Sequence, residues 1–140
     1  MIKNTNFFTF KCFHDKYGHL VPVESNIDIP FEIKRIYYIY DVQKGVRRGF
    51  HSHRNLKQAL ICVHGSVKIL VKTPLQNEEI VLNSPQTALY IGPMVWREMY
   101  EFSDDAVLLV LANEHYDVQD YIRDYKTYEK EAIKYFSYNS

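Results

Sequence analysis

Short stretches of alternating hydrophobic and polar residues, separated by turn residues, follow one another from residue 7 to residue 112. In residues 66–72, for instance, Val67, Ile69 and Val71 occupy every second position. β-Branched and aromatic residues, which favour strands, are frequent in these stretches. Many short strands at regular spacing are typical of a sandwich or barrel. The predicted strands cover residues 7–13, 20–24, 33–40, 58–63, 66–72, 78–82, 87–91 and 106–112.

The hydrophobic pattern changes its period near the end of the chain. Hydrophobic residues there recur at spacings of three and four, which predicts an amphipathic helix over about residues 117–136, with Asp117 as its N-cap. The apolar side of this helix must be buried, most simply against the outside of the β domain. The fold class predicted is therefore all-β, a small barrel or jelly roll with one C-terminal helix.

Composition excludes several classes of protein. The length of 140 residues fits one domain, predicted to span residues 1–140. The 17 basic and 17 acidic residues cancel, whereas duplex-binding proteins usually carry a basic excess, so no nucleic-acid partner is expected. Cys12 and Cys62 are too few for a disulfide framework and indicate reduced thiols in a cytoplasmic protein. We expect neither a secretory signal nor a membrane span, since no apolar run reaches roughly 18–20 residues.

The most specific local pattern is a histidine pair between two glycines. Gly45 is followed after five residues by His51, then by His53, by Gln58 and finally by Gly65. In a strand, residues i and i+2 face the same side, so the two histidines project together. Such a pair also occurs on surfaces without any chemical role, and the spacing alone leaves that alternative open.

This spacing resembles the first sequence motif of the cupins. Metal-binding cupins carry a glutamate ligand where this chain has Gln58, and their second motif ends in a histidine about where Arg97 stands. A guanidinium cation does not ligate a metal, and two histidines are fewer than the three or four protein ligands of a usual divalent site. The resemblance and these departures predict a cupin jelly roll with no metal and no cofactor.

A narrower resemblance covers roughly residues 7–130. Residues 33–41, 48–53, 89–96 and 110–123 resemble those of the bacterial sugar-nucleotide 3,4-ketoisomerases. The resemblance implies a homodimer that converts dTDP-4-keto-6-deoxyglucose to a dTDP-3-keto-6-deoxyhexose. An aminotransferase uses that product to make 3-amino sugars for surface glycans such as O-antigen or S-layer glycans.

The histidines and Arg97 suit this chemistry. Removing the C3 hydrogen next to a C4 ketone gives an enediolate, and returning a proton at C4 moves the ketone to C3. His51 is the expected base, because a neutral imidazole has a suitable pKa. His53 is expected to assist it or to hold sugar hydroxyls, and Arg97 to stabilise the oxyanion from across the barrel. Such a mechanism requires neither metal nor redox cofactor.

Other residues are candidates for substrate binding. Arg35 and Arg48 are expected to bind the diphosphate, because guanidinium groups match phosphate oxygens. Tyr37 shares a strand face with Arg35 and is therefore preferred to Tyr38 as a site residue. Glu98 is a candidate to orient Arg97 or a histidine, although it is equally a candidate surface acid.

The configuration of the product at C4 depends on which face receives the proton. Family members that make the galacto product tend to carry Arg in the turn before the second strand and His after the Pro-x-x-Trp sequence. This chain has Tyr17 and Arg97 at those positions, which favours the gluco product, dTDP-3-keto-6-deoxyglucose.

Three alternatives stay open. A sugar-nucleotide epimerase of the same fold also needs a histidine base beside a ketone and adds a tyrosine acid, and this chain has 12 tyrosines. A non-catalytic cupin that binds a sugar or small effector would also use histidine and arginine. A metal-dependent dioxygenase is the fourth interpretation, and stoichiometric iron or zinc in the purified protein would favour it.

Overall fold

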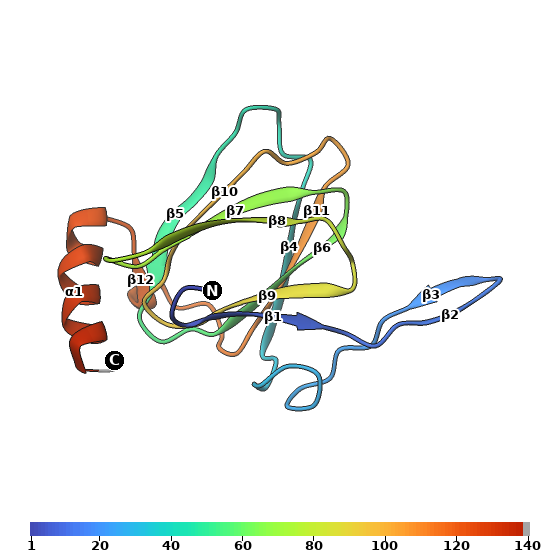
Figure 1. Ribbon diagram of the computed structural model, residues 1–140, viewed down its shortest axis with the longest axis horizontal. Helices are drawn as coiled ribbons and strands as arrows, with labels where there is room; N and C mark the ends of the chain where they lie inside the picture. The colour runs from blue at the N-terminus through green and yellow to red at the C-terminus, as the bar shows by residue number, and fades with distance from the viewer. Residues whose placement is uncertain (139–140) are drawn as a thin grey trace.

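The computed structural model describes residues 1–138, which form two facing five-stranded antiparallel sheets and a C-terminal helix (Figure 1). One sheet has the strand order β1-β9-β6-β11-β4, and the other has the order β12-β5-β10-β7-β8. The strands of the first sheet are β1 (Thr5–Thr9), β4 (Arg35–Tyr40), β6 (Gln58–His64), β9 (Thr87–Ile91) and β11 (Val107–Ala112). Those of the second are β5 (Arg48–His53), β7 (Val67–Lys72), β8 (Asn77–Leu82), β10 (Trp96–Tyr100) and β12 (Tyr121–Ile122).

The main hydrophobic core lies between the two sheets. Leu60 and Leu108 of the first sheet pack there with Ile69 and Val71 of the second, and all four are buried. In β7 the residues at every second position are buried and the others are half-buried, as the alternating pattern requires. The predicted all-β jelly roll with a C-terminal helix is therefore confirmed.

The C-terminal helix begins later than the sequence pattern indicates. Helix α1 covers Tyr125–Tyr138, so the predicted start at residue 117 is wrong. A 3₁₀ turn, η1 (Val118–Asp120), and strand β12 come first, and Tyr121 of β12 pairs with His53 of β5. Asp117 caps η1, whereas Asp124 accepts the hydrogen bond from the Thr127 amide that caps α1. The hydrophobic residues of the 3₁₀ turn and the short strand recur at a spacing similar to that of a helix, and this explains why the pattern predicts too early a start.

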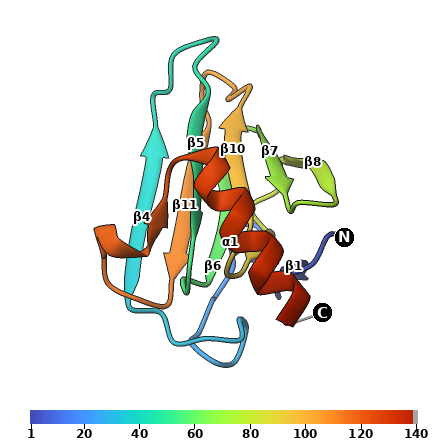
Figure 2. The same ribbon diagram turned by 90° about the vertical axis from the view of Figure 1, so that its left-hand side faces the viewer.

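Helix α1 lies at one end of the two sheets (Figure 2). Its buried residues Tyr128 and Ala132 pack against Met94, Trp96 and Ile122. The apolar side of the helix is thus buried against the β domain, as predicted. No helix in residues 1–138 is long and apolar enough to cross a membrane.

A two-stranded hairpin projects from the body of the molecule. It consists of β2 (Phe13–Asp15) and β3 (Gly18–Leu20), and it extends well away from both sheets (Figure 1). Of the predicted strand at residues 20–24, only Leu20 lies in a strand. The chain after the hairpin covers the outer face of the first sheet, where Ile29 and Phe31 pack on Ile61.

Candidate active site

His51 and Arg97 are direct neighbours in adjacent strands of the second sheet. Strand β10 pairs with β5 so that Arg97 lies opposite His51 and Glu98 opposite Gly49, which leaves Phe50 as the extra residue of a bulge. Phe50 and Gly49 both have positive φ values, 55° and 91°. The prediction that Arg97 faces the histidines from across the barrel is wrong, because both come from one sheet. Their proximity results from strand pairing and not from barrel closure.

Arg97 is a buried cation whose partners are neutral. Its side chain is 2% exposed. One guanidinium nitrogen donates to Oε1 of Gln58, and the Val95 carbonyl accepts from two others at 3.0 and 3.3 Å. No carboxylate in residues 1–138 forms an ion pair with Arg97. Burial lowers the pKa of Arg97 to about 10, so it remains charged at neutral pH.

Both histidines are neutral at pH 7. Burial lowers the pKa of His51 to about 3, and the positive charge of Arg97 contributes. The pKa of His53 is lowered further, again through burial first and Arg97 second. The two rings meet edge to face with centroids 4.9 Å apart. A neutral imidazole is the form that accepts a proton, so either ring has the protonation state of a general base.

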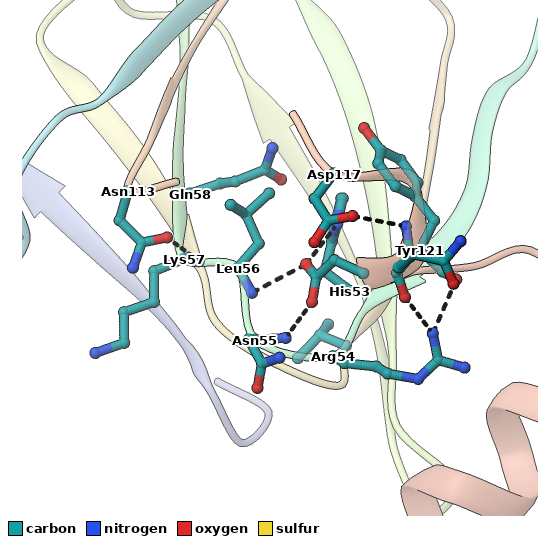
Figure 3. A network of polar contacts seen from close by, with 12 residues as sticks. His53, Arg54, Asn55, Leu56, Lys57, Gln58, Asn113, Asp117 and Tyr121 are labelled. Atoms are coloured by element: carbon teal, nitrogen blue, oxygen red, sulfur yellow. Dashed lines mark hydrogen bonds and ion pairs between the residues drawn. The ribbon is translucent and has the colours of Figure 1, made fainter. Parts of the chain in front are cut away.

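Asp120 is the site residue that the sequence analysis missed. Its Oδ2 lies 3.2 Å from Nδ1 of His53, and since His53 is neutral this contact is a hydrogen bond that Nδ1–H donates. The same carboxylate accepts hydrogen bonds from the backbone amides of Asn55 at 2.8 Å and Leu56 at 3.3 Å. Figure 3 shows Asn55 and Leu56 in the loop that follows His53. Asp120 lies within the range of the predicted helix, in which the pattern gives a structural role to Asp117 alone.

Two neighbouring pockets lie beside the histidines, and Arg35 and Tyr121 line both. The pocket beside His51 has a volume of about 350 Å³, and the one beside His53 about 580 Å³. The first is basic and the second contains several carboxylates. Residues of the first pocket include Arg35, Tyr37, Arg48, His51, Tyr121 and Arg123. Those of the second include Arg35, His53, Glu114, Asp117, Asp120 and Tyr121.

Strand β4 directs Arg35 and Tyr37 into this region, because alternate residues of the strand point inward. The Arg35 guanidinium lies over the ring of Tyr37 at 5.3 Å and over that of Tyr116 at 5.7 Å. The Tyr37 hydroxyl accepts a hydrogen bond of 3.1 Å from Gln58. The structure thus brings together the predicted site residues Arg35, Tyr37, Arg48, His51, His53 and Arg97.

Glu98 does not belong to this group. It lies on the opposite face of β10 from Arg97, where its carboxylate accepts hydrogen bonds from Arg47 at 2.7 Å and from Trp96 at 2.9 Å. The prediction that it orients Arg97 or a histidine is therefore wrong. Alternation along the strand explains the difference, since residues 97 and 98 must face opposite sides.

Tyr17 also lies away from the site in its own chain. It sits at the tip of the β2–β3 hairpin, its side chain is 85% exposed, and neither pocket contains a residue of that hairpin. Figure 1 shows the hairpin pointing away from β5 and β10. Within one chain, Tyr17 cannot act beside Arg97.

The side chains around the histidines do not fit a divalent cation. The guanidinium of Arg97 lies where it would repel a metal ion, and Gln58 is already bonded to it. Within residues 1–138, no three His, Cys, Asp or Glu side chains are grouped so that they could hold a metal.

The chain is similar to several characterised proteins. A family model described as "FdtA: WxcM-like, C-terminal" matches residues 3–133. A TDP-4-oxo-6-deoxy-alpha-D-glucose-3,4-oxoisomerase of Aneurinibacillus thermoaerophilus is 46% identical over 125 residues, which is 89% of this chain and 90% of that protein.

Solved structures give the same picture. The H51N mutant of the 3,4-ketoisomerase QdtA from Thermoanaerobacterium thermosaccharolyticum, in complex with TDP-4-keto-6-deoxyglucose, matches with a TM-score of 0.94 and 55% identity over 96% of this chain and 97% of that one. The TDP-quinovose 3,4-ketoisomerase WlaRB from Campylobacter jejuni matches with a TM-score of 0.89 and 44% identity, over 92% and 99% of the two chains.

Proposed function

The chain belongs to the FdtA family, and we propose that it is a 3,4-ketoisomerase that moves the ketone of TDP-4-keto-6-deoxyglucose from C4 to C3. The observation that carries this proposal is the pairing of a neutral histidine, His51, with the buried cation Arg97, which forms no ion pair with any carboxylate of residues 1–138. A base next to an unpaired cation is what enolisation of a ketone needs.

In the proposed mechanism, His51 removes the proton from C3 and Arg97 stabilises the charge that develops on O4. A proton is then delivered to C4, O3 releases its hydroxyl proton and O4 takes one up, so that the enediolate becomes a C3 ketone with a C4 hydroxyl. One oriented hydrogen-bond donor to an oxyanion typically lowers the free energy of the transition state by about 3–4 kcal/mol. A buried donor needs no reorganisation during the reaction. No step of this mechanism requires a metal or a redox cofactor.

The basic pocket beside His51 is the proposed site of the diphosphate. Arg35 and Arg48 line it, as does Arg123, which the sequence analysis did not single out. Guanidinium groups bind phosphate oxygens through paired hydrogen bonds. The ring of Tyr37 then forms a wall of the pocket next to Arg35.

The proposed product is the gluco isomer, dTDP-3-keto-6-deoxyglucose, an intermediate for 3-amino-3,6-dideoxyhexoses. This proposal depends on Tyr17 and Arg97 together, so it requires Tyr17 to reach a site that lies outside its own chain. The C4 proton coupling of the product distinguishes the gluco from the galacto configuration.

The function is tested by incubating the protein with TDP-4-keto-6-deoxyglucose in heavy water and reading the sugar by proton NMR. A 3-keto product with deuterium at C4 supports the ketoisomerase. Inversion without migration of the ketone would make the protein an epimerase instead. Tight nucleotide binding without exchange would leave only a binding protein. The matched variant His51→Asn should lose turnover and retain nucleotide affinity.

A homodimer is the second part of the proposal. The β2–β3 hairpin exposes the apolar side chains of Phe13, Tyr17 and Leu20, which are 60%, 85% and 61% exposed. Such an apolar projection is suited to burial against a second copy of the chain. In that arrangement Tyr17 would lie beside the partner's site and not beside its own.

Mixing the variants His51→Asn and Tyr17→Ala tests this arrangement. If Tyr17 serves the partner's site, mixed dimers of His51→Asn and Tyr17→Ala chains contain one site with both native residues. Activity should then exceed the sum of the separate variants. No gain on mixing, in a preparation that sedimentation shows to contain mixed dimers, would exclude a role for Tyr17 in the partner's site. A monomer in sedimentation would exclude the dimer itself.

A further inference from the structure

The side chain of Arg54 connects helix α1 to the segment that carries Tyr121. Its Nε and one terminal nitrogen donate to the two carboxylate oxygens of Glu131 at 3.0 and 2.9 Å. The other terminal nitrogen donates to the backbone carbonyls of Gln119 at 2.8 Å and Tyr121 at 3.2 Å. Figure 3 shows the Arg54 side chain extending toward Tyr121. All three guanidinium nitrogens are therefore engaged, although Arg54 and Glu131 line neither pocket.

Three consecutive carbonyls, those of residues 119–121, accept hydrogen bonds from Arg54. The side chain holds the first and the third, and the backbone amide of Arg54 donates to the second, that of Asp120, at 2.9 Å. Strand β12 itself has only two residues, which pair with Ser52 and His53 of β5. So short a strand has little stability of its own, and Arg54 therefore supplies much of what fixes the backbone there.

The position of Tyr121 affects both pockets, because its side chain lines each of them. Its ring centroid lies 4.3 Å from that of His53 and 5.0 Å from that of His51. The guanidinium of Arg123, which lines the basic pocket, lies over the Tyr121 ring at 4.4 Å. A displacement of the Tyr121 backbone would therefore move a wall of both pockets together with one of their cations.

We propose that Arg54 is a positioning residue, which holds the backbone of residues 119–121 and so places Tyr121 and Arg123 for binding of the sugar nucleotide. Glu131 fixes the plane of the Arg54 guanidinium through a two-pronged contact, so the docking of α1 is coupled to the shape of the pockets. The inference rests on the proposed ketoisomerase function. A guanidinium is required, because the compact ammonium of a lysine lacks the planar fork that reaches a carboxylate and two carbonyls together.

Hydrogen exchange tests the positioning without ligand or turnover. In Arg54→Met, the backbone amides of residues 118–122 should exchange about 5–30-fold faster than in the wild type, as expected when one or two hydrogen bonds are lost. Lys68→Met is the matched control. Its ion pair with Glu101 has the same length of 2.9 Å, Lys68 is 34% exposed against 38% for Arg54, and it lines neither pocket. Unchanged exchange of residues 118–122 in Arg54→Met would overturn the proposal.

Binding of TDP tests the consequence for the site. Arg54→Met should raise the Kd for TDP and the KM for TDP-4-keto-6-deoxyglucose by about 5–30-fold, the effect of one or two lost contacts. The kcat should change much less, because the pairing of β5 with β10 still holds His51 opposite Arg97. A fall in kcat with unchanged Kd and KM would overturn the proposal.

Two further variants separate the shape of the Arg54 side chain from its charge. Arg54→Lys should show the same rise in Kd as Arg54→Met, and a wild-type Kd in this variant would overturn the proposal, since charge alone would then suffice. Glu131→Gln weakens the ion pair and leaves the carbonyl contacts. It should give a smaller rise in Kd and provides the test if Arg54→Met unfolds, with Glu101→Gln as its control.

A double-mutant cycle tests whether Arg54 acts through Tyr121. Tyr121→Ala alone should raise the Kd for TDP, and the addition of Arg54→Met should raise it no further, because the ring that Arg54 positions is then absent. Additive effects would overturn the assignment. If the wild-type chain binds no TDP, the proposed ketoisomerase function fails, whereas the exchange measurement still decides whether Arg54 fixes residues 119–121.

Discussion

The Gln58 side chain accepts a hydrogen bond from the Arg97 guanidinium, and this contact joins the two positions at which the chain departs from the metal-binding cupin motifs. A glutamate at one position and a histidine at the other would complete a ligand set with His51 and His53. An amide and a guanidinium instead leave a positive charge that no carboxylate of residues 1–138 neutralises through an ion pair. The same location in the fold then suits an anion better than a cation.

The first prediction concerns the neutrality of Gln58. In Gln58→Glu, the new carboxylate would pair with Arg97 and weaken its attraction for the enediolate oxygen. We expect kcat to fall by about 10²–10³-fold, the cost typical of losing one oxyanion donor. The free energy of unfolding should not fall, because a cation that is already buried gains a partner. Steady-state kinetics and urea unfolding measure the two quantities.

Gln43→Glu is the control for this variant. Gln43 is exposed in a loop, and its replacement by glutamate makes the same change of charge. It should leave kcat unchanged. An unchanged kcat in Gln58→Glu would mean that the charge of Arg97 contributes nothing to the reaction.

The parts of the site that the sequence predicted come from patterns with a fixed geometry. His51 and His53 share a strand face, and Arg35 and Tyr37 share another, because side chains alternate along any strand. Applied to strand β10, the same rule separates Glu98 from Arg97, but that strand was not recognised. Its residues, Trp-Arg-Glu-Met-Tyr, contain no hydrophobic alternation because Arg97 is buried in place of an apolar residue.

The second prediction concerns pH and stability. Burial and Arg97 lower the pKa of His51 from 6.5 to about 3, so between these values the unfolded chain binds a proton that the folded chain does not. The free energy of unfolding therefore decreases as the pH falls below 6.5, by up to about 1.4 kcal/mol per pH unit for one histidine. The lowered pKa of His53 acts in the same direction. Urea midpoints at pH 7.5, 6.0 and 5.0 measure this decrease.

His51→Asn separates this contribution from those of other groups. The variant should lose part of the dependence of the urea midpoint on pH below 6.5. If the pH dependence of His51→Asn equals that of the wild type, His51 is not a buried neutral group in the folded chain.

The third prediction concerns Glu98. Because its carboxylate bonds Arg47 and Trp96 on the face away from the histidines, Glu98→Gln should leave kcat and KM unchanged. The loss of stability should not exceed about 1 kcal/mol, as for other partly exposed ion pairs. The kcat and KM of Glu98→Gln are compared with those of Arg97→Gln, a change at the preceding residue of the strand. A large loss of kcat in Glu98→Gln would restore the role that its contacts contradict.

The residues that the sequence did not predict depend on contacts between distant segments. Asp120 and Arg123 reach the site because β12 pairs with the end of β5, and a two-residue strand leaves no hydrophobic period to detect. Tyr17 is the opposite case, because the sequence predicts a role for it that the fold of one chain does not explain. The family resemblance associates it with Arg97, but the fold of one chain separates them, and only assembly of two chains offers a way to combine them.

The last prediction concerns the bulge that brings His51 opposite Arg97. Gly49 has a φ of +91°, and a Cβ there would lie 2.9 Å from the Arg97 carbonyl oxygen, so Gly49→Ala must push β5 away from β10. Gly45 has a similar φ of +84° but nothing within 4 Å of a Cβ. Both alanine variants should lose about 1–2 kcal/mol of stability through backbone strain. Only Gly49→Ala should also displace His51 from Arg97, and a displacement near 1 Å is expected to lower kcat about 10²-fold. Equal kcat values in the two variants would show that the reaction does not depend on this strand contact.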